Sequence, residues 1–283
     1  MKNPLIKKKI IVGYFGRESV LAKFFIKAYS KKFIFKKFSK DIRNLKEIDF
    51  WLEKNNEIEI LINFAAITSV KKCEMNKKKS MEVNCNSVID ILNLINKSKK
   101  NNIKYFLSLS TSHVFEKSNL KLKENSKKKP NNYYGKTKLK LENFILKNQN
   151  KFKFRIGIGR IFNYYNYGLK KGFFINDVIN KLRKNKKTIT FHNTDTYRDF
   201  ISINDINKAL LKMINLKLKN DFNICSSEKI YLPDIINRLN IKFKRKLIFS
   251  SNKINLNLIG SNLKLKSKGW KITKKNILNE LPK

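Results

Sequence analysis

Cysteine and histidine are scarce in this sequence. Its 283 residues include 3 cysteines and 2 histidines, and neither type is clustered. A disulfide framework needs a larger, even set of cysteines, and a zinc site needs closely spaced cysteines or histidines. The sequence therefore predicts neither a disulfide-stabilised fold nor a metal centre.

Acidic residues are also few. There are 21 Asp and Glu residues against 64 Lys and Arg residues, which gives a formal net charge of +43 at pH 7. Such a charge fits a nucleic-acid or anionic-membrane binder, or a composition that fills exposed positions with lysine. The basic residues are spread along the whole chain, are mostly lysine, and form no basic arm or RNA-binding motif, which favours the second interpretation. We expect no nucleic-acid partner, although the charge should attract phosphorylated ligands.

Long apolar runs are missing too. No run approaches the roughly 18 apolar residues that a membrane span requires. The segment 7–15 superficially imitates a signal peptide, but its apolar part is short, meets Arg17 and has no small-residue cleavage site. We read residues 10–15 as the start of the fold and expect a cytoplasmic protein without a membrane partner.

The patterns that are present indicate an α/β fold. Short apolar runs alternate with helical patterns as far as residue 165, which predicts a doubly wound parallel sheet that binds a dinucleotide at its switch point. The runs expected to be strands are 10–12, 33–35, 58–62, 105–107 and 154–158. The alternation stops in a Tyr-, Asn- and Gly-rich stretch, 164–172, where we expect the chain to enter a smaller second lobe.

Tyr134 and Lys138 carry the strongest catalytic signal. They are four residues apart, so on a helix they share one face. Free tyrosine, with a pKa of about 10, exchanges protons poorly at neutral pH, and a nearby ammonium lowers that pKa. Thr111 or Ser112, at the end of the strand before, could hold a carbonyl oxygen against the phenol. In so lysine-rich a chain, the spacing alone is a weak signal, and the alternative is an exposed tyrosine beside a solvated lysine.

The surrounding residues resemble the extended short-chain dehydrogenase/reductase family, NAD(P)-dependent enzymes that act on nucleotide sugars. A hydroxyl cluster ends a strand, a loop carries Glu124 and Pro130, and Tyr-Gly-x-x-Lys follows with Glu142 one turn on. The run Ser-Thr-Ser-His-Val-Phe at 110–115 is most similar to the dTDP-4-dehydrorhamnose reductase branch. The resemblance implies a Rossmann-type domain over 1–163, with 198–218 packing back onto it, and a mainly substrate-binding lobe over 164–283.

Two further blocks resemble the family's cofactor site. The run from Gly13 to Ser19 is similar to the family's Gly-x-x-Gly-x-x-Gly, in which glycines bring the backbone close to a pyrophosphate, but Ser19 replaces the third glycine. The run Asn-Phe-Ala-Ala at 63–66 is similar to the family's Asn-x-Ala-Ala segment. Further on, Val83-Asn84 opens a helix that we expect to reach about Ser98, and this pair resembles the family's structural asparagine in the helix that flanks the active site. The implied cofactor-binding residues are Gly13, Phe15, Gly16, Asn63, Ala65, Ala66, Tyr134 and Lys138. Lys36 and Lys37, where an acid would select NAD, give NADP a small preference over NAD.

Substrate-binding residues follow from the same resemblance. Asn163 ends an Arg-x-x-Asn block that the family uses to bond the sugar or diphosphate, and Ser112 lies beside the expected Thr111. Arg198 opens an Arg-Asp-Phe block, and a guanidinium can grip diphosphate oxygens in two places. The alternative for Arg198 is an ion pair with Asp199 or Asp205.

The resemblance implies a nucleotide-sugar enzyme with Thr111, Tyr134 and Lys138 as catalytic residues. The family's dehydratases carry Asp-Glu directly after the threonine, and Ser112-His113 stand there instead, which disfavours dehydration. We expect reduction of a nucleotide-activated 4-keto-6-deoxy sugar, as in surface-polysaccharide sugar biosynthesis. C4 epimerisation with retained NAD is the alternative, and a non-catalytic basic protein that binds nucleotides or RNA is an alternative of another class. Members of the family commonly form dimers, so the resemblance implies a homodimer.

Overall fold

The computed structural model describes residues 9–165, 174–184, 186–250, 257–273 and 276–281. The chain forms two compact units. The first unit comprises Met1–Val114, Pro130–Gly159 and Met213–Asp221, and the second comprises Phe115–Lys129, Arg160–Lys212 and Phe222–Lys283. The boundary expected at residues 163–164 stays a prediction, and residues 166–172 of the stretch expected to mark it lie outside the described residues.

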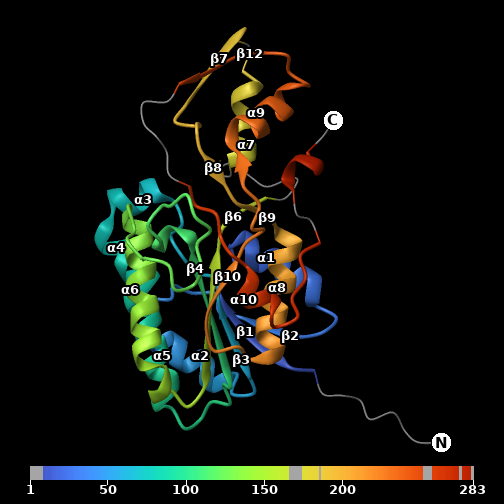
Figure 1. The fold of residues 1–283 in the computed structure, drawn as a ribbon. Coiled ribbons are helices and arrows are strands. Elements are labelled where there is room, and N and C mark those ends of the chain that lie inside the picture. Colours follow the sequence, from blue (N-terminus) through green and yellow to red (C-terminus); the bar gives the residue numbers. More distant parts are fainter. Residues whose placement is uncertain (1–8, 166–173, 185, 251–256, 274–275, 282–283) are drawn as a thin grey trace, which may run out of the picture. The chain divides into compact units, whose positions relative to one another are not determined.

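A six-stranded sheet is the largest element of the structure (Figure 1). Its strand order is β10-β5-β4-β3-β1-β2. The strands are β1 (Ile11–Phe15), β2 (Ile34–Lys37), β3 (Ile60–Asn63), β4 (Tyr105–Thr111), β5 (Arg155–Ile161) and β10 (Asn220–Ile224). Strands β1, β2, β3 and β4 pair in parallel. Every residue of β1, β3 and β4 is buried, as expected for parallel strands covered on both faces.

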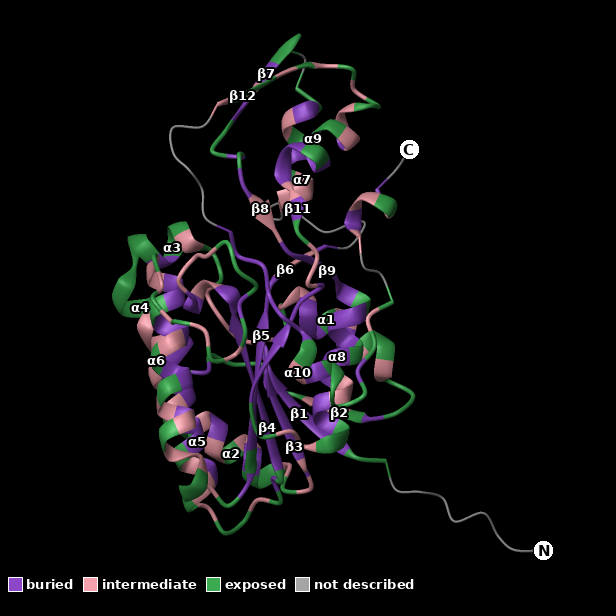
Figure 2. Cartoon of the chain, viewed as in Figure 1, coloured by how far each residue is buried: buried purple, intermediate pink, exposed green. Residues whose placement is uncertain are grey.

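Helices cover both sides of these strands. The helices of the first unit are α1 (Val20–Tyr29), α2 (Leu45–Lys54), α3 (Val70–Met75), α4 (Lys77–Met81), α5 (Ser87–Lys97) and α6 (Tyr133–Asn148). Figure 1 shows α2, α5 and α6 on one side of the sheet and α1 on the other. Figure 2 shows the strands buried and the outer faces of these helices exposed. The predicted Rossmann-type, doubly wound fold is confirmed.

Two elements of the first unit differ from their expected form. Strand β1 continues to Phe15, whereas the sequence predicted a turn from Gly13 onward. A Cβ on Gly13 would meet the side chains of Leu61, Ile58 and Trp51, so this glycine makes room for core packing inside the strand. The helix expected from residue 83 begins as a π-helix, η1 (Glu82–Asn86), before it continues as α5.

The second unit has a core of its own, around Leu182, Ile235, Ile236 and Ile277. Its helices are α7 (Phe174–Leu182), α8 (Ile203–Leu216), α9 (Leu232–Asn240) and α10 (Leu263–Lys266), of which α8 continues into the first unit. Its short strands form three two-stranded sheets: β6 (Asn163–Tyr165) with β9 (Phe200–Ser202), β7 (Thr188–His192) with β12 (Lys246–Ser250), and β8 (Tyr197–Arg198) with β11 (Ile230–Tyr231).

Buried carboxylates fix the loops of this unit. Asp199 accepts hydrogen bonds from the backbone and hydroxyl of Ser226 at 2.7 and 2.6 Å, from Ser227 N at 2.9 Å and from Gly260 N at 3.2 Å. Asp205 accepts from the backbone and hydroxyl of Thr273 at 3.0 and 2.6 Å. Each carboxylate therefore joins segments that are distant in sequence.

Candidate active site

The N-terminus of α6 holds Tyr134 in place. Asn132 caps the helix by accepting a hydrogen bond from Gly135 N at 2.9 Å, and the Glu74 carboxylate accepts from Tyr133 N at 2.7 Å. A side-chain oxygen and a negative charge at this end of a helix satisfy its free N–H groups and its dipole. A Cβ on Gly135 would collide with the carbonyl of His113, so glycine is what permits the helix to approach the end of β4.

Lys138 lies one turn along α6 and is buried, with 3% of its surface exposed. Its Nζ donates a 2.9 Å hydrogen bond to the carbonyl of Leu109 in β4. Burial lowers the pKa of Lys138 to about 8, partly offset by the negative charge of Glu142. The alternative of a solvated lysine is therefore wrong, and Lys138 is a buried ammonium at neutral pH.

The end of β4 brings hydroxyl groups to the same region. Thr111 and Ser112 are both buried, and the hydroxyl of Ser110 is buried without a hydrogen-bond partner among the described residues. The ring of His113 lies edge-on to the ring of Tyr134, with 5.8 Å between centroids, and its Nδ1 is 2.8 Å from the Asn132 amide nitrogen. Tyr134 is 8% exposed, which also excludes the alternative of an exposed tyrosine.

Asn84, in the π-helix, connects the loop after β3 to α6. Its Oδ1 accepts from Ile67 N at 2.8 Å, and its Nδ2 donates to Ile67 O at 3.0 Å and to the hydroxyl of Thr137 at 3.2 Å. Thr137 in turn donates to the carbonyl of Tyr134 at 2.7 Å. Asn84 thereby fixes the segment after Ala66 relative to the turn that carries Tyr134. The Val-Asn resemblance indicated a structural asparagine here, but not its partners.

The turn after β1 fits a dinucleotide phosphate. Gly16 has a φ of +84°, and a Cβ there would collide with the backbone of Phe64 and Ala65. Ser19, the residue before α1, has a φ of −62°, so the third position of the motif does not need the left-handed backbone that favours glycine. Helix α1 has no acidic residue in its first turn, which leaves its amino end suited to an anion.

Asn63 is a second feature that indicates a ligand-binding site. Its Oδ1 accepts from Ala65 N at 3.0 Å, while its Nδ2 is buried and has no partner among the described residues. A buried donor without an acceptor is costly, which suits a site that a polar ligand completes. Gly16, Asn63, Ala65 and Ala66 therefore form a cradle suited to a dinucleotide, with Phe15 at the end of β1.

The two lysines at the end of β2 differ in their surroundings. Lys36 Nζ lies 3.3 Å from the Glu57 carboxylate, whereas Lys37 is exposed. Only Lys37 therefore remains as a candidate partner of a ribose phosphate, which weakens the preference for NADP drawn from the pair.

The predicted substrate-binding residues Asn163 and Arg198 belong to the second unit. Asn163 Nδ2 donates to the carbonyl of Asp199 at 3.2 Å. Arg198 Nη1 donates to the Thr196 hydroxyl at 2.5 Å and to the Tyr197 carbonyl at 2.8 Å. Among the described residues Arg198 makes no ion pair, so the alternative of a pair with Asp199 or Asp205 is wrong.

Neither of two surface hollows of the second unit contains a predicted catalytic residue. The first measures about 380 Å³ and is lined by Lys123, Glu124, Asn125, Ser261, Leu263 and Lys264. The second measures about 370 Å³ and is lined by Glu116, Lys117, Ser118, Leu120, Lys121, Leu122, Lys123, Ser126 and Lys127. Within the described ranges, no three His, Cys, Asp or Glu side chains gather in a way that would hold a metal ion. None of the helices described here is both long and apolar enough to cross a membrane.

The sequence matches the model of the NAD dependent epimerase/dehydratase family over residues 22–225, and the chain belongs to this family. The family that the motifs predicted is thereby confirmed. A curated relative, the GDP-6-deoxy-D-talose 4-dehydrogenase of Aggregatibacter actinomycetemcomitans, is 32% identical over 124 residues. That match spans 42% of this chain and 41% of the relative, less than half of either protein.

Solved structures share the fold at low sequence identity. RMD from Pseudomonas aeruginosa, complexed with NADPH, has a TM-score of 0.81 at 19% identity and covers 96% of this chain and 98% of its own. The UDP-glucose 4-epimerase of Thermus thermophilus, complexed with NAD, has a TM-score of 0.80 at 13% identity, with 93% and 94% covered. At such identities these likenesses establish the fold alone.

Proposed function

We propose that this protein is an NAD(P)-dependent reductase of a nucleotide-activated 4-keto-6-deoxy sugar. The observation that carries the proposal is the burial of Tyr134 and Lys138 on one face of α6, with Lys138 bonded to the end of β4 at Leu109. Removing an ammonium from water has a high energetic cost, and a buried charge of this kind beside a phenol is typical of catalytic sites.

Tyr134, Thr111 and Lys138 would each have a separate role in the acid–base chemistry. Tyr134 would donate its phenolic proton to the oxyanion that forms from the sugar ketone. Thr111 would hydrogen-bond the same oxygen, and Lys138 would lower the pKa of Tyr134 through its positive charge. Ser112 would contact the sugar beside Thr111. Because Tyr134 and Lys138 are buried, water competes little for these groups.

The bound cofactor, NAD or NADP, would supply or accept the hydride at the sugar carbon. Gly16 and the amino end of α1 would hold its pyrophosphate, and Asn63, Ala65 and Ala66 would lie along its ribose. Lys138 would also bond the nicotinamide ribose. Gly13 would act through packing of β1, since it lies inside the strand.

In the second unit, Arg198 and Asn163 would bind the diphosphate and sugar of the substrate. The name of the curated relative, a GDP-6-deoxy-D-talose 4-dehydrogenase, supports oxidation and reduction at C4 of a 6-deoxy sugar. The absence of the Asp-Glu pair after Thr111 continues to disfavour dehydration. A homodimer remains a prediction.

C4 epimerisation is the second candidate, because it uses the same tyrosine and lysine and because a UDP-glucose 4-epimerase shares the fold. The two reactions differ in how the cofactor is held. An epimerase keeps NAD through each cycle, whereas a reductase releases its oxidised cofactor after each turnover.

The experiment is to release small molecules from the denatured protein for mass spectrometry, and then to titrate NADPH and NADH and assay dTDP- and GDP-linked 4-keto-6-deoxy sugars. We expect an empty protein that binds a reduced dinucleotide and oxidises it with one of these ketones. Retained NAD would favour the epimerase. A protein that binds no dinucleotide would contradict both and leave the non-catalytic binding protein.

A further inference from the structure

Arg198 carries a charge that no described residue neutralises. The hydrogen bonds of its side chain use Nη1, so Nε and Nη2 make no bond within the described part of the chain. The acid next to it, Asp199, is fully occupied by four donors from Ser226, Ser227 and Gly260. A half-buried guanidinium with unused donors is suited to an anion from outside the chain.

A second cation, Lys117, lies near Arg198 because the chain segments that carry them both pair with residues 257 and 258. Ser118 N donates to Asn257 O at 3.0 Å, and Leu258 forms a parallel bridge with Arg198. Residues 257 and 258 thus lie between the segment of Lys117 and the strand of Arg198. All these residues belong to the second unit.

The buried side chain of Asn257 fixes this arrangement. Its Oδ1 accepts from Tyr197 N at 3.1 Å, and its Nδ2 donates to Asn119 Oδ1 at 3.0 Å. One amide therefore ties the residue before Arg198 to the residue two after Lys117. The two cation-bearing segments are held by hydrogen bonds on both sides of Asn257.

The two charges affect each other, and no carboxylate among the described residues pairs with either. Burial lowers the pKa of Lys117, and the positive charge of Arg198 lowers it further; burial also lowers the pKa of Arg198. The neighbouring acid, Glu116, instead pairs with Lys127 at 3.0 Å and Lys129 at 3.8 Å. Like charges held together in a partly buried place are unfavourable until an anion binds.

We propose that Lys117 and Arg198 form one anion subsite that takes the diphosphate of the substrate, and that Lys117 determines its preference for a diphosphate over a single phosphate. The inference rests on the proposed function, in which Arg198 alone was assigned to the diphosphate. The planar guanidinium suits one phosphate, and the ammonium supplies a point charge for the other. A carboxylate carries one negative charge for two cations, and a single phosphate offers one phosphoryl group where a diphosphate offers two.

The test is calorimetric titration of the full-length protein with inorganic pyrophosphate and with orthophosphate at constant ionic strength. The variant is Lys117→Met, which keeps most of the side-chain volume and removes the charge. The matched control is Lys242→Met, which removes the same charge from an exposed lysine of the second unit. One series contains saturating NADPH, so that pyrophosphate does not enter the cofactor site.

We expect Lys117→Met to weaken pyrophosphate binding by about 10- to 100-fold, as the loss of a charged hydrogen bond predicts. Orthophosphate binding should change much less, so the preference for pyrophosphate should fall. Lys242→Met should stay within about twofold of the wild type. Equal pyrophosphate affinities of the two variants would overturn the proposal.

Two further readouts separate the possible causes. Removal of one of two repelling charges should leave the melting temperature of Lys117→Met unchanged or raised, so lost binding would not reflect unfolding. If Arg198→Met and Lys117→Met lose binding and the double variant loses less than their sum, the two cations serve one site. Loss of pyrophosphate binding in Arg198→Met but not in Lys117→Met would contradict the proposal.

This outcome is distinguishable from that of the proposed function. A protein that binds no dinucleotide but loses pyrophosphate affinity in Lys117→Met would refute the reductase and keep the subsite. A protein that reduces a 4-keto sugar nucleotide while Lys117→Met binds pyrophosphate normally would keep the reductase and refute the subsite.

Discussion

Lys138 shows how a single residue can connect burial to chemistry. The loss of water around its ammonium lowers its pKa to about 8, while its bond to the Leu109 carbonyl and the charge of Glu142 keep the charged form available. The group is therefore poised near physiological pH. Such a balance is expected where a charge must act on a neighbouring phenol.

The first prediction concerns pH. A lowered lysine pKa means that the ammonium is present below about pH 8 and is lost as the pH rises through that value. Because the ammonium assists Tyr134, and Tyr134 must itself hold a proton to donate it, kcat/KM for ketone reduction should fall above about pH 8. The measurement is a pH–rate profile for the reductive direction. A constant rate between pH 7 and pH 9 would remove Lys138 from the mechanism.

The second prediction concerns the phenol. Tyr134→Phe should lower kcat by about 10²- to 10⁴-fold, the usual range for the loss of a general acid, and should leave dinucleotide binding largely intact. Tyr133→Phe is the matched control, since Tyr133 is the preceding residue and its ring stacks against Lys77 instead. Similar rates for both variants would exclude Tyr134 as the acid.

Single residues were predictable from the sequence where a motif fixes their chemistry, as for Tyr134 and Lys138. Lys117 was not, because one lysine among so many carries no signal until Asn257 brings it next to Arg198. The packing role of Gly13 was not predictable either, because the glycine motif does not indicate that Trp51 and Leu61 fill the space beside it.

At the scale of elements, the amino end of α6 determines where Tyr134 lies. Asn132 and Glu74 satisfy its first N–H groups, and the glycine at position 135 permits close contact with β4. The helix is thereby set by local bonds as well as by its apolar face. Any change that frays this turn should displace the phenol.

The third prediction compares two helix caps. Asn132→Ala should destabilise the protein by about 0.5–2 kcal/mol and should also lower kcat. Asn44→Ala removes the corresponding cap of α2, where Asn44 accepts from Glu47 N at 3.3 Å, and should cost a similar free energy of unfolding without changing kcat. Urea unfolding and steady-state rates measure both. If the two variants had equal kcat, the cap of α6 would be structural only.

The fourth prediction concerns the clamp made by Asn84. Asn84→Asp removes the two donated bonds to Ile67 O and Thr137 and leaves a buried carboxylate, which should destabilise the protein by about 1–3 kcal/mol. It should also weaken dinucleotide binding, because the segment after Ala66 keeps only the bond from Ile67 N and loses its connection to Thr137. Asn86→Ala, in the same π-helix, is the control. Unchanged dinucleotide affinity in Asn84→Asp would show that the clamp does not position the cofactor site.

The elements themselves were largely predictable, and their ends were not. Continuous apolar runs located the strands, but β1 and β5 extend about three residues further than expected, to Phe15 and Ile161. In β1 the extension depends on glycine fitting beneath a tryptophan. In β5 it depends on Arg160, which is fully buried and stacks on Phe115 at 5.1 Å. Both are tertiary contacts that a local pattern does not contain.

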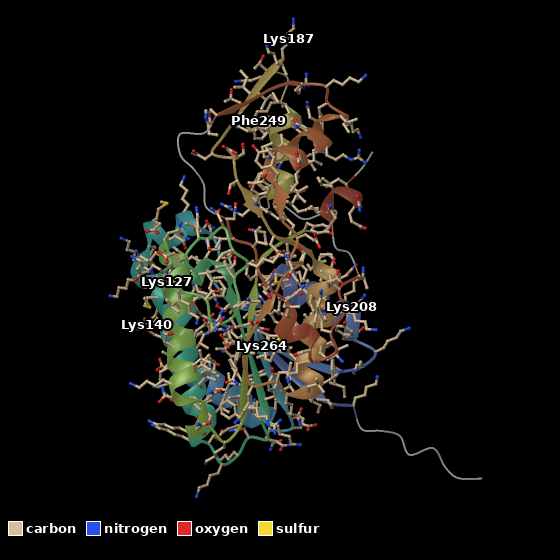
Figure 3. The ribbon with its side chains drawn as sticks, viewed as in Figure 1. Lys127, Lys140, Lys187, Lys208, Phe249 and Lys264 are labelled. Carbon is tan, nitrogen blue, oxygen red and sulfur yellow. The ribbon has the colours of Figure 1, made fainter. Side chains whose placement is uncertain are left out.

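At the scale of the whole molecule, the excess of lysine is the dominant feature. Figure 3 shows lysine side chains reaching outward from both units, among them Lys127, Lys140, Lys187 and Lys208, rather than from a single element. A field of one sign around the protein should raise the local concentration of anions, including a nucleotide sugar. It does not by itself specify where they bind.

The fifth prediction concerns salt. Raising the ionic strength from about 0.05 to 0.5 M should increase the KM for the nucleotide sugar several-fold, because mobile ions screen the attraction, and should leave kcat nearly unchanged. A series with sucrose in place of salt controls for viscosity and water activity. A KM that does not depend on salt would mean that the net charge has no part in substrate capture.

The measurement that tests the account most directly is a single-turnover reaction of the purified protein with deuterated NADPH or NADH and a nucleotide-linked 4-keto-6-deoxy sugar, followed by mass spectrometry of the sugar. The account predicts one deuterium in the sugar product of the wild type. It also predicts a Tyr134→Phe variant that binds the dinucleotide but forms this product at least about 100-fold more slowly. Transfer at the same rate in both proteins, or no dinucleotide binding by the wild type, would contradict it.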